Sequence, residues 1–512
     1  MNLIDCTLRD GGYYNNWFFS KKLINQYLKI ISKLEIKYCE LGFRFLDRKI
    51  NRGFTAYTED TFLDEINIPH NIKIGVMINA SDFLDVNKIK IKSLEKTFLK
   101  KNKKIFFIRI ACHLKEIFYI KPIVNYLKSK SYLVMVNLMQ VSEVSKSDLV
   151  KISKFMNKLD IKVFYIADSL GSLTPNKLSK ILRNLKNNIK IDLGLHAHDN
   201  LNLALKNSIF AYKKGAKWID STICGMGRGA GNLKTEDIIR YIDSKKLNIL
   251  NIFIKKYFLR IKKKYNWGTN KFYKFAALKK IHPTYIQNLV SDIRFKNISI
   301  KNILNNLRSL ESKKYNPNNI LFSLDLFNTK VFKSDISLNL FKNKNIILIG
   351  SGIVKKNKKK LETIINKKKF FVVTLNNNYI LKRNLVDLRL ISHPMRLLSF
   401  EAASKKFDSP IISPIKNIKP KLRWILFNKN IETFHFGIRI NKNVFIKIKK
   451  NFLETSNPLA LTYALSIFYL AKIKTIHIAG FKDRNFDNFQ KDESDKVFNF
   501  FKKKIKFVNL IN

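Results

Sequence analysis

Residues 189–200 read Ile-Lys-Ile-Asp-Leu-Gly-Leu-His-Ala-His-Asp-Asn, an apolar stretch that ends in two histidines one residue apart. We interpret the apolar part as a β-strand. Side chains two apart on a strand point to the same side, so His196 and His198 can reach one ion. By itself such a pair is more often structural than metal-binding, and the order of the surrounding elements decides its meaning.

Eight apolar runs of strand length precede residue 245, and stretches with the spacing of amphipathic helices separate them. We predict strands at Leu3–Leu8, Tyr38–Leu41, Ile74–Ile78, Ile105–Ile110, Leu133–Leu138, Val163–Ala167, Ile189–His196 and Trp218–Thr222. Alternation of eight strands with helices is typical of a (β/α)8 TIM barrel. The fold class predicted for residues 1–245 is therefore α/β, with a closed parallel barrel.

Polar residues follow several of these strands, at the end where such a barrel carries its chemistry. They are Arg9, Asp10, Glu40, Asp168, His196, His198 and Asn232. Two neutral imidazoles and a carboxylate leave about three open positions on an octahedral Mn²⁺ or Mg²⁺ ion, enough for a substrate to chelate through two oxygens. The pattern predicts a divalent metal site suited to Lewis-acid chemistry.

The remaining sequence predicts two further parts. Residues 246–323 have helical periodicity, and we interpret them as a helical extension packed on the barrel. Residues 324–512 return to an α/β pattern, with strands at 345–349, Phe370–Leu375, Val386–Ile391 and Thr475–Ala479. This pattern predicts a separate C-terminal Rossmann-like domain.

A nucleotide or phosphate ligand is one prediction for the C-terminal domain. Gly350-Ser351-Gly352 follows a strand and could lay a helix N-terminus against a phosphate, although a plain tight turn fits the sequence equally well. Asn457-Pro458, before a helix expected at Leu459–Leu470, and Gly480-Phe481-Lys482-Asp483, after a strand, occupy comparable positions.

Composition argues against several kinds of partner. Lys and Arg number 97 against 38 Asp and Glu, a formal charge of +59. Because the Lys excess is spread through every segment, we do not expect nucleic-acid binding. No signal peptide or membrane span is visible, and four cysteines without a C-x-x-C pair favour buried reduced thiols. We expect a cytoplasmic protein with no membrane partner, and we leave a homodimer open.

Five motifs occur in an order that resembles one enzyme superfamily. They are Thr7-Leu8-Arg9-Asp10-Gly11, Glu40-Leu41-Gly42-Phe43, Ala167-Asp168-Ser169-Leu170-Gly171, Leu195-His196-Ala197-His198-Asp199-Asn200 and the Gly-rich run at 225–232. Together they resemble the DRE-TIM metallolyase superfamily (the HMGL-like or pyruvate carboxyltransferase domain) over roughly the first 240 residues. Arg109-Ile110-Ala111-Cys112-His113 and the run at 164–169 are most similar to its 4-hydroxy-2-oxovalerate aldolase branch.

The resemblance implies roles for the polar residues named above. It makes Asp10, His196 and His198 metal ligands, Arg9 the group that stabilises an enolate oxygen, and Glu40 a residue that orders the metal ligands. We also expect Asp168 and Ser169 to orient the substrate, and Asn232 to cap its loop or to reach the metal site. For Asp168 and Glu40 a buried hydrogen-bonding or ion-pair role fits the sequence equally well.

One position departs from the aldolase pattern. Tyr13 stands where that branch has a histidine as catalytic base. A phenol with a pKa of about 10 is a poor base at neutral pH but a workable acid, or a base if a neighbouring cation lowers its pKa. His113, and His282 and Tyr285 if the helical extension folds over the barrel mouth, are alternatives for proton transfer, and each fits a structural role equally well.

We therefore predict a metal-dependent carbon–carbon lyase that cleaves or forms a 4-hydroxy-2-oxo acid through a metal-bound pyruvate enolate. Two alternatives stay open. One is a Claisen-type enzyme that condenses an acyl-CoA with a 2-oxo acid. The other is a barrel without catalysis that scaffolds the C-terminal domain, which the tyrosine at position 13 keeps open.

Overall fold

The chain divides into two compact units, Met1–Ser323 and Leu324–Asn512. The computed structural model describes residues 1–48, 51–85, 88–291, 300–308, 312–316, 319–320, 323, 330, 332–350, 357–376, 381–392, 409–417, 432–441, 443–456, 459–481 and 488–511. Six residues predicted above to adjoin a ligand lie outside these ranges: Ser351, Gly352, Asn457, Pro458, Lys482 and Asp483. No helix in the described ranges is long and apolar enough to cross a bilayer.

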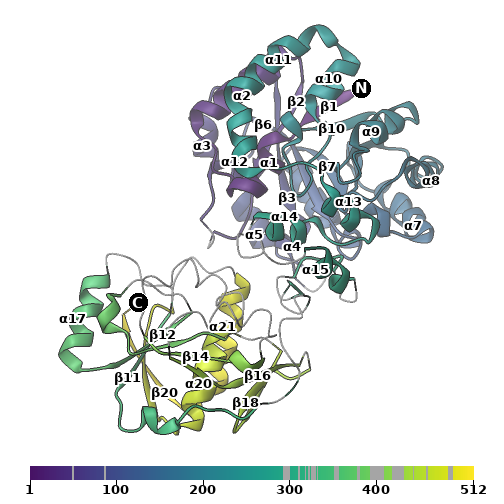
Figure 1. The fold of residues 1–512 in the computed structure, drawn as a ribbon. Helices are drawn as coiled ribbons and strands as arrows, with labels where there is room; N and C mark the ends of the chain where they lie inside the picture. Colours follow the sequence, from purple (N-terminus) through teal and green to yellow (C-terminus); the bar gives the residue numbers. More distant parts are fainter. Residues whose placement is uncertain are drawn as a thin grey trace. The chain divides into compact units, whose positions relative to one another are not determined.

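A closed barrel of eight parallel strands forms the centre of the first unit (Figure 1). The strands are β1 (Asn2–Asp5), β2 (Tyr38–Phe43), β3 (Lys73–Asn79), β6 (Ile105–Cys112), β7 (Leu133–Leu138), β8 (Val163–Ala167), β9 (Asp192–His196) and β10 (Trp218–Ser221). Their order around the barrel is β1-β10-β9-β8-β7-β6-β3-β2. Both faces of such strands are covered, which explains their nearly continuous apolar sequences. The predicted TIM barrel is confirmed.

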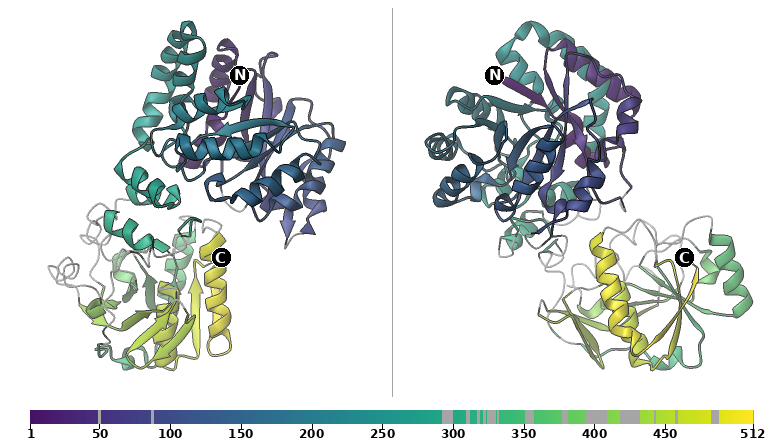
Figure 2. Two further views of the ribbon diagram at one scale, coloured as in Figure 1. Left: turned by 90° about the vertical axis from the view of Figure 1, so that its right-hand side faces the viewer. Right: turned by 180° about the vertical axis from the view of Figure 1, so that it is seen from behind.

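Helices follow the strands and ring the barrel (Figure 2). They are α1 (Thr7–Asn15), α2 (Lys21–Lys33), α3 (Asp60–Asp64), α4 (Ala80–Phe83), α5 (Ile91–Thr97), α6 (Lys121–Ser129), α7 (Lys146–Met156), α8 (Pro175–Lys186), α9 (Ala204–Lys213) and α10 (Thr235–Ile242). A small hairpin, β4 (Leu84–Asp85) and β5 (Lys88–Ile89), is an unpredicted addition. Capping fixes where helices begin: the Ser20 hydroxyl, for example, accepts a hydrogen bond from the Leu23 backbone N–H at 3.2 Å.

The first strand is shorter than predicted. We expected a strand over Leu3–Leu8, but β1 ends at Asp5 and α1 begins at Thr7. The Asp5 carboxylate accepts hydrogen bonds from the backbone N–H and the hydroxyl of Thr7, at 3.0 and 2.5 Å, which turns the chain directly into the helix. Arg9 and Asp10 consequently lie in the first turns of a helix that starts at a strand end.

A helical extension completes the first unit. It comprises α11 (Leu247–Phe253), a π-helical segment at Ile254–Phe258, α12 (Leu259–Tyr265), α13 (Lys271–Leu278), α14 (Pro283–Ser291) and α15 (Ile300–Leu307). Gln287 of α14 accepts a hydrogen bond from the Gly229 backbone N–H at 3.0 Å and donates one to the Tyr13 carbonyl at 3.2 Å. The extension therefore contacts helix α1 and the Gly-rich loop, both of which carry motifs of the barrel mouth.

The second unit is built on a seven-stranded parallel sheet in the order β15-β14-β13-β12-β11-β19-β20. The strands are β11 (Ile346–Ile349), β12 (Phe371–Leu375), β13 (Leu388–Leu390), β14 (Ile411–Ser413), β15 (Thr433–His435), β19 (Thr475–Ala479) and β20 (Lys506–Ile511). Alternate residues of β11 belong to two cores, one with α20 (Ala460–Leu470) and α21 (Asn488–Lys502), the other with α17 (Lys358–Lys368). Helices thus cover both faces, as the Rossmann-like prediction requires.

A second, three-stranded sheet in this unit was not predicted. It consists of β16 (Gly437–Ile440), β18 (Phe452–Thr455) and β17 (Ile446–Lys449), in that order. β17 and β18 form an antiparallel pair, whereas β16 and β18 are parallel. Its strands have only four residues each, too short for a clear periodicity in the sequence.

Candidate metal centre

Asp10, His196 and His198 come together at the C-terminal mouth of the barrel. One ligand atom from each lies within 4.8 Å of the others, and all three side chains are buried. His196 ends β9 and His198 follows it by two residues, with their ring centroids 5.0 Å apart. The Nε2 atom of His196 lies 3.6 Å from Oδ2 of Asp10. The structure thus places one carboxylate and two imidazoles in the geometry of a shared cation site.

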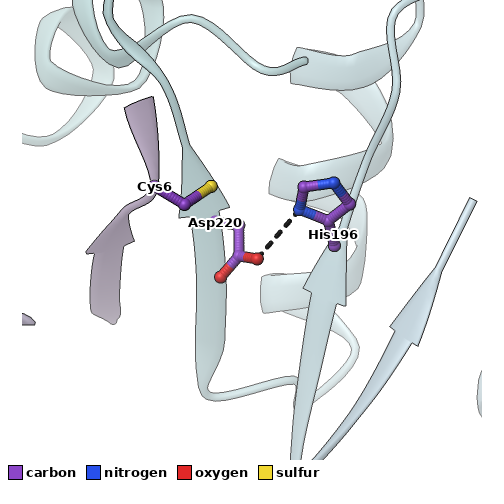
Figure 3. Close-up of side chains that lie close together, drawn as sticks. All are labelled: Cys6, His196 and Asp220. Atoms are coloured by element: carbon purple, nitrogen blue, oxygen red, sulfur yellow. Dashed lines mark hydrogen bonds and ion pairs between the residues drawn. The ribbon is translucent and has the colours of Figure 1, made fainter. Parts of the chain in front are cut away.

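Asp220 on β10 fixes the orientation of His196. Its Oδ2 lies 2.9 Å from Nδ1 of His196, as Figure 3 shows. Burial opposes ionisation of Asp220, but Arg109 and His196 outweigh it and lower the pKa of this carboxyl to about 2. An ionised carboxylate only accepts hydrogen bonds, so Nδ1 of His196 carries a proton, and Nε2, which faces Asp10, is the nitrogen available to a metal ion.

The buried charges beneath the centre form a closed ring. Arg9 donates to Asp10 and to Glu40, both at 2.7 Å. Nε of Arg109 lies 3.0 Å from the other oxygen of Glu40, and the rest of its guanidinium donates to both oxygens of Asp220. Asp220 and His196 close the ring. Arg9, Glu40 and Arg109 each lie between two groups of opposite charge, which is what burial of so many ions requires.

The electrostatics of the pocket favour a positive charge between the ligands. Burial would raise the pKa of Asp10, but Arg9 and His196 hold it well below its usual range. Burial would lower the pKa of His196, but hydrogen bonds to Asp10 and Asp220 raise it. Burial and the charge of His196 lower the pKa of His198, which keeps this ring neutral. An ionised carboxylate and a neutral imidazole are the forms that bind metals.

Unpartnered polar atoms mark the space that a ligand would fill. Within the described ranges, Nδ1 of His198, Oδ1 of Asn232 and Nη2 of Arg9 are buried without a hydrogen-bond partner. Asn232 also donates through Nδ2 to Asp10, so it adjoins the centre. This nitrogen and oxygen donor set fits a divalent ion such as Mn²⁺ or Mg²⁺. Buried polar atoms usually have a hydrogen-bond partner, a water molecule or an ion as a neighbour.

Gly227 is required for close approach to the centre. A Cβ atom at this position would lie 2.4 Å from Nδ2 of Asn232 and 2.8 Å from Oδ2 of Asp10. Both distances are shorter than van der Waals contact. The Gly-rich loop can therefore cover the ligands only because residue 227 has no side chain.

A second group of potential ligands, Cys6, His196 and Asp220, lies beside the first (Figure 3). Both carboxylate oxygens of Asp220 already accept from Arg109, and one of them also contacts His196. The Cys6 thiol lies 3.5 Å from the Ser221 carbonyl, and burial raises its pKa well above the ordinary value. We interpret this group as support for His196. All four cysteines of the chain are buried free thiols, as predicted.

Tyr13 is close to the centre but does not have the pKa of a base. The guanidinium carbon of Arg228 lies 5.4 Å from the centre of its ring, and this cation favours ionisation of the phenol. Burial opposes ionisation more strongly, so the pKa of Tyr13 is raised. The hydroxyl is therefore protonated at neutral pH and can donate a hydrogen bond.

The other residues considered for proton transfer separate into two groups. His113 and His282 are largely buried, and burial with the charge of Arg228 lowers the pKa of both, so they are neutral at pH 7. Tyr285 instead donates to the Lys314 carbonyl at 3.0 Å and accepts from the Asn316 backbone N–H at 2.9 Å. Its hydroxyl is engaged within the helical extension.

Asp168 and Ser169 are held by the loops around them. The two oxygens of Asp168 accept from the backbone N–H groups of Ser172 and Leu173, at 2.9 and 3.0 Å. Burial nevertheless raises the pKa of Asp168 to about 7. The Ser169 hydroxyl accepts from the Gln140 backbone N–H at 3.1 Å. These bonds correspond to the structural alternative left open for Asp168, and Glu40 likewise occupies a buried ion-pair role.

Three charged residues near the candidate centre were given no role by the sequence reasoning: Arg109, Asp220 and Arg228. Arg109 and Asp220 lie within β6 and β10 and are almost completely buried. A charged residue inside an apolar parallel strand was the signal available, since both faces of such a strand are buried. Arg228 lies in the Gly-rich loop, where the sequence alone gives no signal that separates it from the other residues of the motif.

Fold and site together define a class: a TIM barrel with a buried carboxylate–imidazole centre at its C-terminal mouth. The family description HMGL-like matches residues 1–260, and the chain belongs to this family. It is 25% identical over 239 residues to oxaloacetate decarboxylase of Mycobacterium tuberculosis, covering 46% of this chain and 68% of that protein. It is 24% identical over 244 residues to 4-hydroxy-2-oxovalerate aldolase of Geobacillus thermodenitrificans, covering 47% and 69%.

Among solved structures, the chain is similar to the "N-terminal domain of a putative aldolase" from Bacteroides vulgatus. The TM-score is 0.50 at 32% sequence identity, and the match covers 57% of this chain and 97% of that one. The relatives are lyases or decarboxylases by name, so an enzyme of the metal-dependent lyase kind is supported. These curated relatives match 46–47% of the chain.

Proposed function

We propose that the chain is a divalent-metal-dependent lyase that cleaves or forms the C3–C4 bond of a 4-hydroxy-2-oxo acid, with pyruvate and an aldehyde as the cleavage products. One observation carries this proposal: the buried donor atoms of Asp10, His196 and His198 lie within 4.8 Å of one another, and Nη2 of the neighbouring Arg9 is unpartnered. The aldolase relative supports the same reaction class.

The residues present would divide the work as follows. Asp10, His196 and His198 would hold the cation, which when bound supplies Lewis-acid stabilisation of negative charge on the substrate ketone. The free Nη2 of Arg9 would donate to the same ketone oxygen, because Glu40 and Asp10 already fix its other nitrogens. A preorganised donor in a buried pocket stabilises a developing oxyanion without reorganisation.

Cleavage also requires a proton acceptor. The C3–C4 bond breaks, its electron pair stays on C3 as the enolate, and the C4 hydroxyl proton leaves to a base; C3 then takes a proton to give pyruvate. We assign the proton transfers to His113 and His282, because both are neutral at pH 7. Tyr13, whose pKa is raised, would donate a hydrogen bond instead.

The test combines metal content with product release from the full chain. D10N and H196A are compared with the wild type and with D192N, a variant at the opposite end of β9. We expect Mn²⁺-dependent pyruvate release in the wild type and in D192N, and loss of both bound Mn²⁺ and turnover in the other two. Undiminished turnover after complete removal of metal would contradict the proposal.

The oxaloacetate decarboxylase relative favours a second candidate reaction at the same site. There the bond that breaks joins C3 to a carboxylate, and the products are carbon dioxide and the same pyruvate enolate. Carbon dioxide release from oxaloacetate, without aldehyde release from any 4-hydroxy-2-oxo acid, would select this candidate. Free CoA release from an acyl-CoA would select a Claisen-type enzyme, and bound metal with no turnover would select a scaffold.

A further inference from the structure

Arg228 is a cation at the barrel mouth that has no anionic partner among the described residues. It lies in the Gly-rich loop at 225–232, and its side chain is partly buried. Its Nε atom is buried and has no hydrogen-bond partner, and no carboxylate within the described ranges forms an ion pair with it. Arg9 and Arg109, by contrast, each contact two carboxylates. A partly buried guanidinium with a free donor is a candidate for binding an anion.

The residues on either side locate Arg228 between the metal centre and the helical extension. A Cβ atom on Gly227 would lie 2.8 Å from Oδ2 of Asp10. A Cβ atom on Gly229 would lie 2.6 Å from Cβ of Pro283, the residue that follows His282. The Arg228 guanidinium itself lies 5.4 Å from the ring of Tyr13. Arg228 is therefore close enough to Asp10, His196 and His198 for one small substrate to contact both the arginine and the metal site.

The described groups around Arg228 are mostly neutral side chains. The phenol ring of Tyr13 and the imidazoles of His113 and His282 lie near its guanidinium. Of the nearby acids, Asp10 binds Arg9 and Asn232, and Glu116 accepts from the His113 backbone N–H. Neither of these carboxylates forms an ion pair with Arg228, so this cation is available to an anionic ligand.

We propose that Arg228 forms a subsite for a second anionic group of the substrate, a carboxylate or a phosphate at the end remote from the 2-oxo acid. The inference rests on the proposed function, which assigns the 2-oxo acid end to Arg9 and the three metal ligands. The planar guanidinium donates two parallel hydrogen bonds to either group. The aldehyde product is then itself an anion.

Three substrates test the subsite in the full chain with Mn²⁺. They are 4-hydroxy-2-oxovalerate, which has a neutral methyl end, 4-hydroxy-2-oxoglutarate, which has a carboxylate there, and 2-keto-3-deoxy-6-phosphogluconate, which ends in a phosphate. The wild type is compared with R228M, which removes the charge, and R228K, which keeps it. R183M is the matched control, since Arg183 is exposed on α8, away from the mouth.

We expect kcat/KM of the wild type to be on the order of 10- to 100-fold higher for one anionic substrate than for the methyl one, the range of a charged hydrogen-bonding contact. R228M should abolish this ratio through KM, R228K should restore part of it, and R183M should leave it unchanged. Which anionic substrate is preferred distinguishes a carboxylate from a phosphate. A wild-type preference for the methyl substrate, or an unchanged ratio in R228M, would overturn the inference while leaving the lyase proposal intact.

A binding measurement separates the two proposals further. 2-Oxoglutarate and 2-oxopentanoate differ only in a terminal carboxylate or methyl group, and calorimetry gives Kd for each with the Mn²⁺-loaded protein. We expect 2-oxoglutarate to bind at least about 10-fold more tightly, and R228M to remove the difference. The same result without any pyruvate release would uphold the subsite and contradict the lyase. Equal affinities in the wild type would contradict the subsite.

Discussion

Replacing Asp220 with asparagine tests whether the buried ring of charges holds the metal ligands in place. Interactions with Arg109 and His196 lower the pKa of this fully buried carboxyl from 3.8 to about 2. At about 1.4 kcal/mol per unit of pKa shift, folding stabilises the ionised form of Asp220 by roughly 2 kcal/mol relative to the unfolded chain. D220N should lose about this much unfolding free energy at pH 7. Because the pKa is lowered on folding, the loss should be present above pH 4 and should shrink as the pH falls towards 2.

The same substitution should weaken metal binding. Asp220 keeps the proton of His196 on Nδ1, and loss of such a carboxylate typically raises the metal Kd by about 10- to 100-fold. Urea unfolding of the metal-free protein gives the stability, and calorimetric titration with MnCl₂ gives the affinity. D192N is the control, because Asp192 pairs with Lys217 at the other end of the same strand. If D220N bound Mn²⁺ as tightly as D192N, the ring would have no part in ordering the centre.

Four further substitutions have defined outcomes. G227A should raise the Kd for Mn²⁺ at least about 10-fold, because the new Cβ would lie 2.8 Å from Oδ2 of Asp10. An unchanged Mn²⁺ titration curve would show that the Gly-rich loop does not need to pack closely against Asp10. Y13F should reduce kcat less than about 10-fold at pH 7, because Tyr13 is protonated, whereas H282A should reduce it by about 100-fold or more, because His282 is neutral and can accept a proton. If steady-state kinetics showed the larger loss for Y13F, Tyr13 would again be the candidate base. Burial raises the pKa of Asp168 to about 7, so ionisation of this carboxyl destabilises the folded wild type as the pH rises from 4 to 8. Over this range D168N should become more stable relative to the wild type, by about 4 kcal/mol of unfolding free energy at most. A difference in urea midpoints that did not change with pH would contradict this.

The barrel could be predicted from the sequence because strand and helix periodicities alternate along the chain. His196 and His198 lie at the end of one strand, whereas Asp10 was added to them by the family resemblance. The predicted first strand, Leu3–Leu8, extends too far, because a short apolar run does not distinguish a strand from the helix that begins at Thr7. Only the hydrogen bonds of Asp5 to Thr7 set that boundary.

Contacts between distant residues were beyond sequence reasoning. Arg109 and Asp220 are 111 residues apart, and only barrel closure brings them together. The raised pKa of Tyr13 likewise depends on burial that no local pattern reveals. In the C-terminal unit, individual strands could be predicted, whereas the position of β19 beside β11 follows from long-range pairing. The described residues of the C-terminal unit do not indicate its role.

The central claim is that Asp10, His196 and His198 bind a single cation, and anomalous diffraction tests it most directly. Crystals of the full chain soaked in MnCl₂ would be measured on both sides of the manganese absorption edge. We predict one strong difference peak within bonding distance of all three side chains, lost in D10N crystals treated in the same way. Absence of a peak at this place under saturating manganese, or a peak bound to other residues, would contradict the account.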